Sequence, residues 1–244
     1  MPSASQTQSS RKLPRPKKIS VRQKSAHAAE PKITPADLFA RFTQWFLKRD
    51  QQPFTFQLDV WKAMAAGNDG LLHAPTGTGK TLAAWLGALC RSYTVPTEHE
   101  KPGIRTVWVT PLRALATDTA RALEEPLTDL TDAVGQCWRV GTRTGDTSAA
   151  DRRRLRQNWP EALITTPESL SILLSLEDSH EIFADLDTVI VDEWHELLAT
   201  KRGVQTELAL SRLRAIRPNM ITWGLSATLS NLDEAVTALV GPQR

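Results

Sequence analysis

Residues 70–81 read Gly70-Leu71-Leu72-His73-Ala74-Pro75-Thr76-Gly77-Thr78-Gly79-Lys80-Thr81, and the core of this stretch follows the phosphate-binding loop pattern, with Ala74 where that pattern usually has glycine. Gly77 and Gly79 allow a tight turn whose backbone N–H groups point into an anion site. Lys80 can reach the β- and γ-phosphates of a nucleotide, and the Thr81 hydroxyl can ligate Mg²⁺. The stretch therefore predicts a nucleoside triphosphate site.

The neighbouring sequence supplies the context that this motif requires. Gly70-Leu71-Leu72 is a short apolar run typical of a buried strand, and Leu82 to Leu89 reads as a mostly buried helix. The alternative, a glycine turn beside an exposed lysine, needs no strand and no helix at these places. We therefore predict that the loop residues bind ATP, namely Thr76, Gly77, Thr78, Gly79, Lys80 and Thr81.

Composition leaves room for one large α/β domain or two small ones in the 244 residues. No apolar run approaches the ~20 residues that cross a membrane, so we expect no membrane partner. Cys90 and Cys137 lie far apart without metal-ligand spacing, which predicts free thiols. Because nothing indicates a secretory signal or an oxidising compartment, the chain is expected to be cytoplasmic.

Charge divides the chain at about residue 32. Residues 1–32 hold eight Lys and Arg and one acid, so residues 33–244 hold 22 of the 30 basic and 26 of the 27 acidic side chains, a net charge of −4. The first segment has almost no large apolar residues and is predicted to be a disordered basic tail. It could bind phosphate backbones, act as an address, or be a solvated extension.

Alternating strands and helices are predicted after two initial helices, which begin at Thr34-Pro35 and near Gln57. Several runs, such as Thr188 to Val191, are apolar on both faces, which indicates a parallel sheet covered by helices on each side. Ligands bind at the carboxyl ends of the strands in such folds. The expected strands are 71–73, 105–110, 136–140, 162–165, 188–192 and 221–226, and the helices between and after them are 82–91, 114–123, 149–158, 168–176, 204–216 and 232–239.

An acidic pair, Asp192-Glu193, directly follows one of these apolar strands. In a chain that also has a phosphate loop, such a pair predicts a Mg²⁺ site in which Asp192 holds the metal and Glu193 orients or deprotonates the attacking water. An acidic helix cap is the simpler alternative. His195 completes an Asp-Glu-x-His box.

Taken together and in order, the motifs are similar to those of the superfamily 2 helicases, and the chain resembles the first RecA-like lobe of a large helicase-related (Lhr-type) DExH enzyme of the bacterial DNA-ligase-associated branch. The resemblance covers about residues 35–241. It rests on residues 72–81, Thr110-Pro111-Leu112-Arg113-Ala114-Leu115, Arg143-Thr144-Gly145-Asp146-Thr147-Ser148, Ile164-Thr165-Thr166-Pro167-Glu168-Ser169-Leu170, Asp192-Glu193-Trp194-His195-Glu196-Leu197, Lys201-Arg202-Gly203-Val204-Gln205 and Leu225-Ser226-Ala227-Thr228-Leu229-Ser230.

The resemblance implies roles for further residues. Gln57 would read the adenine, although a lone glutamine on a helix is usually a surface residue. Three loops would contact the phosphates of one strand, through Pro111, Arg113, Thr144, Gly145, Asp146, Thr166 and Pro167. His195, Ser226 and Thr228 would couple the nucleotide site to the strand.

For the whole enzyme, the resemblance implies an ATP-dependent 3′→5′ DNA helicase or translocase that acts on single-stranded DNA in repair, with a functional link to a DNA ligase and a nuclease. The 244 residues end where the first lobe of the family should end and do not include its second RecA-like lobe, so a fragment or truncated product with little ATP turnover of its own is expected. Two alternatives stay open: an RNA-acting DExH lobe, and a module that binds ATP and a strand without turnover.

Overall fold

The computed structural model describes residues 33–95, 103–134, 138–228 and 231–241. The basic tail predicted for residues 1–32 lies outside these ranges, as does Cys137. Within them, no helix combines the length and apolar character needed to span a bilayer.

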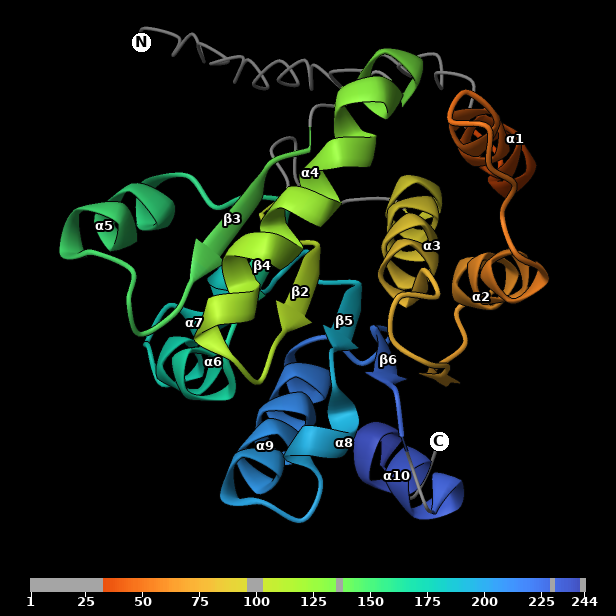
Figure 1. The fold of residues 1–244 in the computed structure, drawn as a ribbon. Helices are drawn as coiled ribbons and strands as arrows, with labels where there is room; N and C mark the ends of the chain where they lie inside the picture. Colours follow the sequence, from red (N-terminus) through yellow and green to blue (C-terminus); the bar gives the residue numbers. More distant parts are fainter. Residues whose placement is uncertain (1–32, 96–102, 135–137, 229–230, 242–244) are drawn as a thin grey trace, which may run out of the picture. The chain divides into compact units, whose positions relative to one another are not determined.

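A six-stranded parallel sheet forms the centre of the described part, in the spatial order β1-β6-β5-β2-β4-β3 (Figure 1). This arrangement confirms the predicted α/β fold of a RecA-like lobe. The strands are β1 (Gly70–His73), β2 (Thr106–Val109), β3 (Val140–Arg143), β4 (Ala162–Thr165), β5 (Thr188–Val191) and β6 (Ile221–Ser226).

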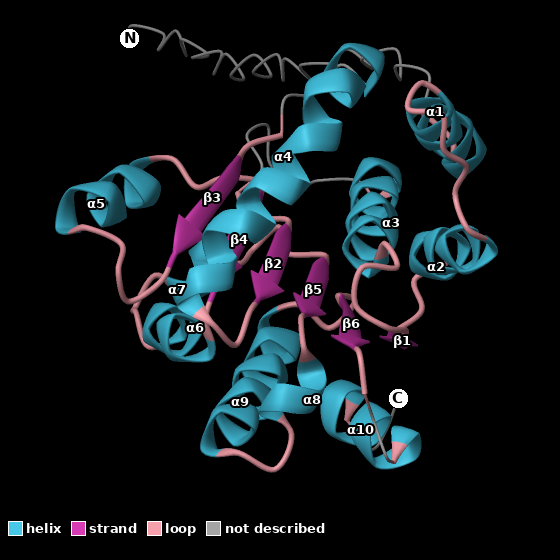
Figure 2. Cartoon of the chain, viewed as in Figure 1, coloured by secondary structure: helices cyan, strands magenta, loops and turns pink. Residues whose placement is uncertain are grey.

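Helices cover both faces of the sheet, because alternate strand residues point to opposite faces (Figure 2). Trp108 and Ile190 pack on one face with α1 (Pro35–Leu47), α2 (Thr55–Ala65), α3 (Lys80–Thr94) and α4 (Arg113–Val134). Val107 and Val189 pack on the other face with α6 (Pro167–Leu174), α7 (Ser179–Ile182), α8 (Trp194–Leu197), α9 (Lys201–Ile216) and α10 (Leu232–Val240). The remaining helix, α5 (Ala149–Gln157), buries none of its residues.

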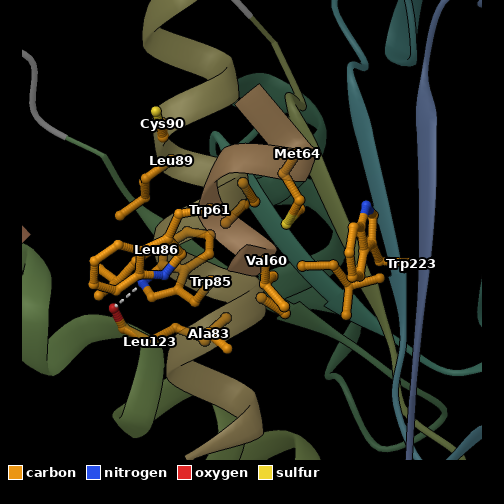
Figure 3. Close-up of a cluster of buried hydrophobic side chains, with 14 of the residues drawn as sticks. Val60, Trp61, Met64, Ala83, Trp85, Leu86, Leu89, Cys90, Leu123 and Trp223 are labelled. Atoms are coloured by element: carbon orange, nitrogen blue, oxygen red, sulfur yellow. Dashed lines mark hydrogen bonds between the residues drawn. The ribbon is translucent and has the colours of Figure 1, made fainter. Parts of the chain in front are cut away.

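The first cluster fixes α3, the helix that follows the phosphate loop. Trp61 and Met64 of α2 pack against Trp85 and its neighbours on α3 (Figure 3), and the Trp85 indole donates a 2.9 Å hydrogen bond to the carbonyl of Leu123 on α4. A side chain at Gly87 would collide with Met64, so this glycine allows the two helices to approach closely. The position of the loop is thus set by a closely packed core that is rich in tryptophan.

The predicted helix start at Thr34-Pro35 is confirmed. Thr34 caps α1 and forms a reciprocal capping box with Asp37, while Pro35 occupies the first turn. Gly67, at φ +85°, follows the end of α2 in the left-handed region that favours glycine.

Several elements differ from the predictions in detail. The strand expected at 136–140 is β3, Val140–Arg143, an edge strand whose polar Thr142 and Arg143 gave no apolar signal. The helix expected at 114–123 continues to Val134 through Pro126, because Leu123, Leu127 and Leu130 keep one apolar stripe against the core. The short helices α7 and α8 were not predicted, since four residues show no helical period.

Candidate nucleotide and nucleic-acid site

The phosphate loop turns at two glycines and ends on a buried lysine. Gly77 and Gly79 have φ values of +75° and +86°, which glycine adopts without strain. Lys80 begins α3, and its Nζ donates hydrogen bonds to the carbonyl oxygens of Ala74 and, at 3.2 Å, Pro75. The loop carbonyls therefore hold the ammonium group at the start of the helix, where its charge and the helix dipole coincide.

Gln57 lies against this loop from the first turn of α2. Its Nε2 donates to the Gly79 carbonyl at 3.1 Å, its Oε1 accepts from the Phe54 N–H at 2.8 Å, and the residue is 1% exposed. It is therefore not a surface glutamine, as the simpler alternative would have it. Its adenine-reading role stays a prediction.

A hollow of about 690 Å³ opens beside Gln57 and the loop, lined by residues that include Phe46, Pro53, Phe54 and Gly77. Phe54 is 60% exposed and stacks on Phe56 with an interplanar angle of 11°. An exposed aromatic face at the rim of such a hollow suits a planar base. Phe54 was not among the predicted site residues, although its place three residues before Gln57 was a signal.

Asp192 lies at the end of β5, next to the loop-bearing half of the sheet. Its Oδ1 accepts from the Glu193 N–H at 3.0 Å and its Oδ2 accepts from the Trp108 indole at 3.3 Å. Burial, and then the adjacent Glu193 carboxylate, raise the pKa of Asp192 to about 6. Trp108, on the neighbouring strand β2, orients this carboxylate and gave no signal in the sequence beyond apolar character.

Thr81 and Asp192 offer the hydroxyl and carboxylate oxygens that suit Mg²⁺, which proteins commonly hold through one or two carboxylates and the substrate phosphates. Two observations fit a bound cation. Burial and the adjacent Glu193 carboxylate raise the cost of ionising Asp192, and Glu193 Oε2 is buried without a hydrogen-bond donor among the described residues.

Glu193, His195 and Ser226 form a line toward the phosphate loop. Glu193 has a left-handed backbone (φ +45°), and its Oε2 lies 3.4 Å from His195 Nδ1, an ion pair only when the imidazole is protonated. His195 Nδ1 lies 3.1 Å from Ser226 Oγ. The carbonyl of Ser226 accepts from the Ala74 N–H at 3.1 Å, so the end of β6 is bonded to the loop. Thr228 joins through its carbonyl, which accepts from Ser226 Oγ at 3.1 Å.

The residues predicted to contact a strand follow β2, β3 and β4, the other half of the same sheet edge. The exposed Arg113 and Asp146 form a 3.0 Å ion pair, and the Arg113 guanidinium lies directly over Gly145. A Cβ at Gly145 would be 2.7 Å from Arg113 Cζ, so glycine permits this approach. The structure thus brings Arg113, Gly145 and Asp146 together.

The other predicted strand contacts are more buried. Thr166 is 1% exposed, and its hydroxyl caps α6 by accepting from the Ser169 N–H, while Pro167 begins that helix. Thr144 is also buried and accepts from the Asp146 N–H. Pro111 is buried at the end of β2. These residues shape the loops, and a strand would meet mainly their backbone groups and the exposed Arg113.

Two residues of the Lys201–Gln205 run, Arg202 and Gly203, make contacts that account for their identity. Arg202 Nε lies 2.6 Å from Glu168 Oε1, which joins α9 to α6. Burial acts to raise the pKa of Glu168. The hydrogen bond from Arg202, together with weaker contributions from its other contacts, outweighs burial and holds this pKa below its usual value. Gly203 faces the Leu197 carbonyl so closely that no side chain fits there.

Comparison with known proteins agrees with this geometry. Residues 54–235 match the DEAD/DEAH box helicase family. The chain is 38% identical over 228 residues to the Lhr helicase/uracil glycosylase of Escherichia coli (strain K12), covering 88% of this chain and 15% of that protein. It is 40% identical over 217 residues to the Lhr helicase/probable uracil glycosylase of Mycolicibacterium smegmatis, covering 84% of this chain and 14% of that protein.

A solved structure of Mycobacterium smegmatis helicase Lhr bound to ssDNA and AMP-PNP is also similar, with a TM-score of 0.72 and 37% identity over 86% of this chain and 27% of that one. The chain thus spans a small part of these relatives. The resemblance to Lhr-type helicases is confirmed, while the ligase-associated branch stays a prediction. Since the family match covers most of the described residues, the chain belongs to the DEAD/DEAH box helicase family.

Proposed function

We propose that this chain is the ATP-binding lobe of an ATP-dependent DNA helicase or translocase, and that it binds ATP with Mg²⁺ and one nucleic-acid strand. The observation that carries the proposal is the division of one sheet edge into two halves. The phosphate loop follows β1, Asp192 follows β5 and Ser226 ends β6, while Arg113, Gly145 and Thr166 follow β2, β3 and β4. A ligand on either half meets loops that share one rigid sheet.

Side chains of this lobe have distinct tasks in the proposed reaction. Lys80 leaves the Ala74 and Pro75 carbonyls and binds the β- and γ-phosphates. Thr81 and Asp192 hold Mg²⁺, which when bound neutralises charge on the phosphates. Glu193 accepts a proton from the water whose oxygen bonds to the γ-phosphorus, while the bond from that phosphorus to the β-phosphate oxygen breaks and ADP leaves. Glu193 Oε2, which is buried and accepts no hydrogen bond from the described residues, is the candidate atom.

Coupling of the nucleotide site to the strand is assigned to His195, Ser226 and Thr228 as the family resemblance implies, and their contacts connect Glu193 to the phosphate loop within the nucleotide half. The 3.4 Å and 3.1 Å approaches of His195 Nδ1 join Glu193 to Ser226, and Ser226 is bonded to Ala74. A shift of Glu193 on hydrolysis would therefore reach the end of β6 through His195, and the phosphate loop through the bond between Ser226 and Ala74. Thr228 follows through its bond to Ser226.

DNA is the favoured strand because the similar Lhr structure contains ssDNA together with AMP-PNP. The 3′→5′ direction, the role in repair, the second RecA-like lobe and the link to a DNA ligase and nuclease are carried by the family resemblance alone. They form the finer part of the proposal.

Reciprocal binding tests the proposal directly. The full chain is titrated with fluorescent single-stranded DNA, with and without Mg²⁺ and a non-hydrolysable ATP analogue. Each ligand should change the affinity for the other by the same factor, as linkage requires. Absence of strand binding, or binding that ignores the analogue, would overturn the proposal.

Two further arms separate the alternatives. Single-stranded RNA that competes better than DNA would favour an RNA-acting lobe. ATP turnover is measured with a second RecA-like lobe supplied on the same chain, because an arginine from that lobe is worth ~10³–10⁵ in rate. Turnover that stays absent would favour a module that only binds.

A further inference from the structure

Helix α5 (Ala149–Gln157) is an exposed basic helix at the edge of the sheet. It carries four arginines and one acid, Asp151, and none of its residues is buried. Surface helices normally bury an apolar stripe, which supplies most of their stability. Here only Leu155 is half-buried, and it lies over Gly141 of the edge strand β3. The composition of this helix is therefore not explained by packing.

The arginines of α5 are arranged unequally around the helix. At about 100° per residue, Arg152, Arg156 and Arg153 fall within a ~100° arc, and Arg154 lies on the far side of it. We call the first three the arginine face. Arg154 is 84% exposed and lies 3.7 Å from Asp151 in its own helix.

The arginine face continues directly from the predicted strand-binding loops. Arg152 Nη2 donates a 3.0 Å hydrogen bond to the carbonyl of Gly145, the residue over which the Arg113 guanidinium lies. Ser148, which caps α5, belongs to the same loop. Arg113 and Arg152 of the arginine face thus contact the same residue, Gly145.

Cations crowd at this place without enough anions to balance them. Arg143, at the end of β3, has its pKa lowered first by burial and then by repulsion from Arg152 and Arg156. Asp178 pairs with Arg156 at 3.1 Å, and no ion pair involving Arg153 is found within the described ranges. Residues 33–244 carry a net charge of −4, so this local excess runs against the general charge. Clustered guanidinium groups of this kind suit phosphates, which they bind bidentately.

We propose that the arginine face of α5 binds the phosphate backbone of the nucleic acid where it leaves the loops after β2, β3 and β4. The inference rests on the proposed function, since it extends the same strand beyond its first contacts. Its ligand is a phosphodiester chain, read without regard to base sequence.

A salt titration of strand affinity tests this extension. The variant Arg153→Gln/Arg156→Gln removes two charges from the arginine face, and Arg154→Gln/Arg121→Gln removes two from elsewhere. Arg121, on α4, is 78% exposed and is therefore a matched surface position. Affinity for a long single-stranded DNA is measured by fluorescence anisotropy between ~50 and ~200 mM salt.

The arginine-face variant should lose affinity and reduce the slope of log affinity against log salt by about 1.4, which corresponds to ~0.7 for each lost phosphate contact on a single strand. The control variant should keep the wild-type slope. Equal slopes in the two variants would overturn the proposal. If the double variant has a lowered melting temperature, Arg153→Gln alone decides, with half the expected change.

A short DNA that fills only the loops separates this inference from the proposed function. The arginine-face variant should bind it as the wild type does, while Arg113→Gln should bind it weakly. Failure of the wild type to bind either DNA would refute the proposed function itself. Normal wild-type binding with an unchanged slope in the arginine-face variant refutes only the role of α5.

Discussion

Gln57 and Gly79 are joined by a hydrogen bond of 3.1 Å from the side-chain Nε2 to the backbone carbonyl, although 22 residues separate them. The same amide accepts the Phe54 N–H at 2.8 Å, so one buried side chain connects the start of α2 to the phosphate loop. Two features require glycine at position 79. Its φ of +86° lies in the left-handed region, and a Cβ would be 2.8 Å from Gln57 Nε2.

Replacement of Gln57 by glutamate should weaken ATP binding by about tenfold. The carboxylate still accepts from the Phe54 N–H through one oxygen, but its other oxygen cannot donate to the Gly79 carbonyl. That second oxygen is then a buried acceptor without a donor, which costs ~1–3 kcal/mol. Affinities for ATP and GTP are measured by titration with fluorescent analogues. A larger loss for ATP than for GTP would support adenine reading, equal losses would assign Gln57 to loop positioning, and unchanged affinity would refute both roles.

Lys80→Ala and Glu193→Gln should separate nucleotide binding from chemistry. Lys80 is the motif lysine of the phosphate loop, so its removal should abolish ATP binding. Glu193→Gln keeps Asp192 and its bonds to Trp108 and to the backbone, so binding should persist while hydrolysis in the two-lobed enzyme is lost. The assignment of Glu193 is wrong if this variant loses ATP affinity as severely as Lys80→Ala.

Much of the fold was predictable because its decisive signals are local. The apolar runs of β4 and β6 were predicted with the bounds that the structure shows, and Thr34-Pro35 fixed the start of α1. Gly203 is the third residue of α9, whereas the predicted helix begins at Val204, three residues too late. A glycine that admits a neighbouring carbonyl cannot be told from one that breaks a helix by sequence alone.

The candidate site was predictable in its motifs and not in its supporting contacts. Strand ends gave the positions of Lys80, Asp192 and Ser226. Trp108, which orients Asp192, and Arg152, which bonds the Gly145 carbonyl, depend on strand order and loop packing. Such partners lie far away in the chain, and nothing in their local sequence marks them.

Gly145→Ala should weaken strand binding and leave stability unchanged. The new Cβ would displace the Arg113 guanidinium, whose exposed side chain moves at little cost, and no unusual backbone angle is needed at this position. Strand affinity and the melting temperature are measured in both backgrounds of a double-mutant cycle with Arg113→Ala. If Gly145→Ala weakens binding further when Arg113 is already absent, the displacement of Arg113 is not the cause.

Cys90 should be inert in the folded chain. Burial raises the pKa of its thiol to about 12, and the residue is 0% exposed. At pH 8 only about one thiol in ten thousand would be ionised, whereas an ordinary thiol with a pKa near 8.5 is about one quarter thiolate. In a Cys137→Ser variant, a thiol reagent should react slowly in buffer and fully in denaturant. Rapid labelling of the native protein would show that α3 opens locally.

Asp187→Asn should destabilise the fold, because Asp187 neutralises a buried cation. Its Oδ2 lies 2.7 Å from Arg105 Nη2, and the two side chains are 2% and 6% exposed. The hydroxyls of Ser92 and Thr188 complete its shell at 2.8–2.9 Å, at the end of the sheet opposite the ATP site. Loss of one partner of a buried pair costs ~3–5 kcal/mol, since the other charge stays buried.

Urea unfolding measures this cost against two controls. Asp59→Asn removes a carboxylate that lies 3.9 Å from Lys62 in a pair that is 66% exposed on both sides, so the free energy of unfolding should not change measurably. Asp187→Leu/Arg105→Met removes both buried charges and should recover much of the stability lost by Asp187→Asn, since an apolar pair leaves no charge unpaired. A double variant less stable than Asp187→Asn would mean that hydrogen bonds from Ser92 and Thr188, and not the neutralised charge, carry the contribution of Asp187.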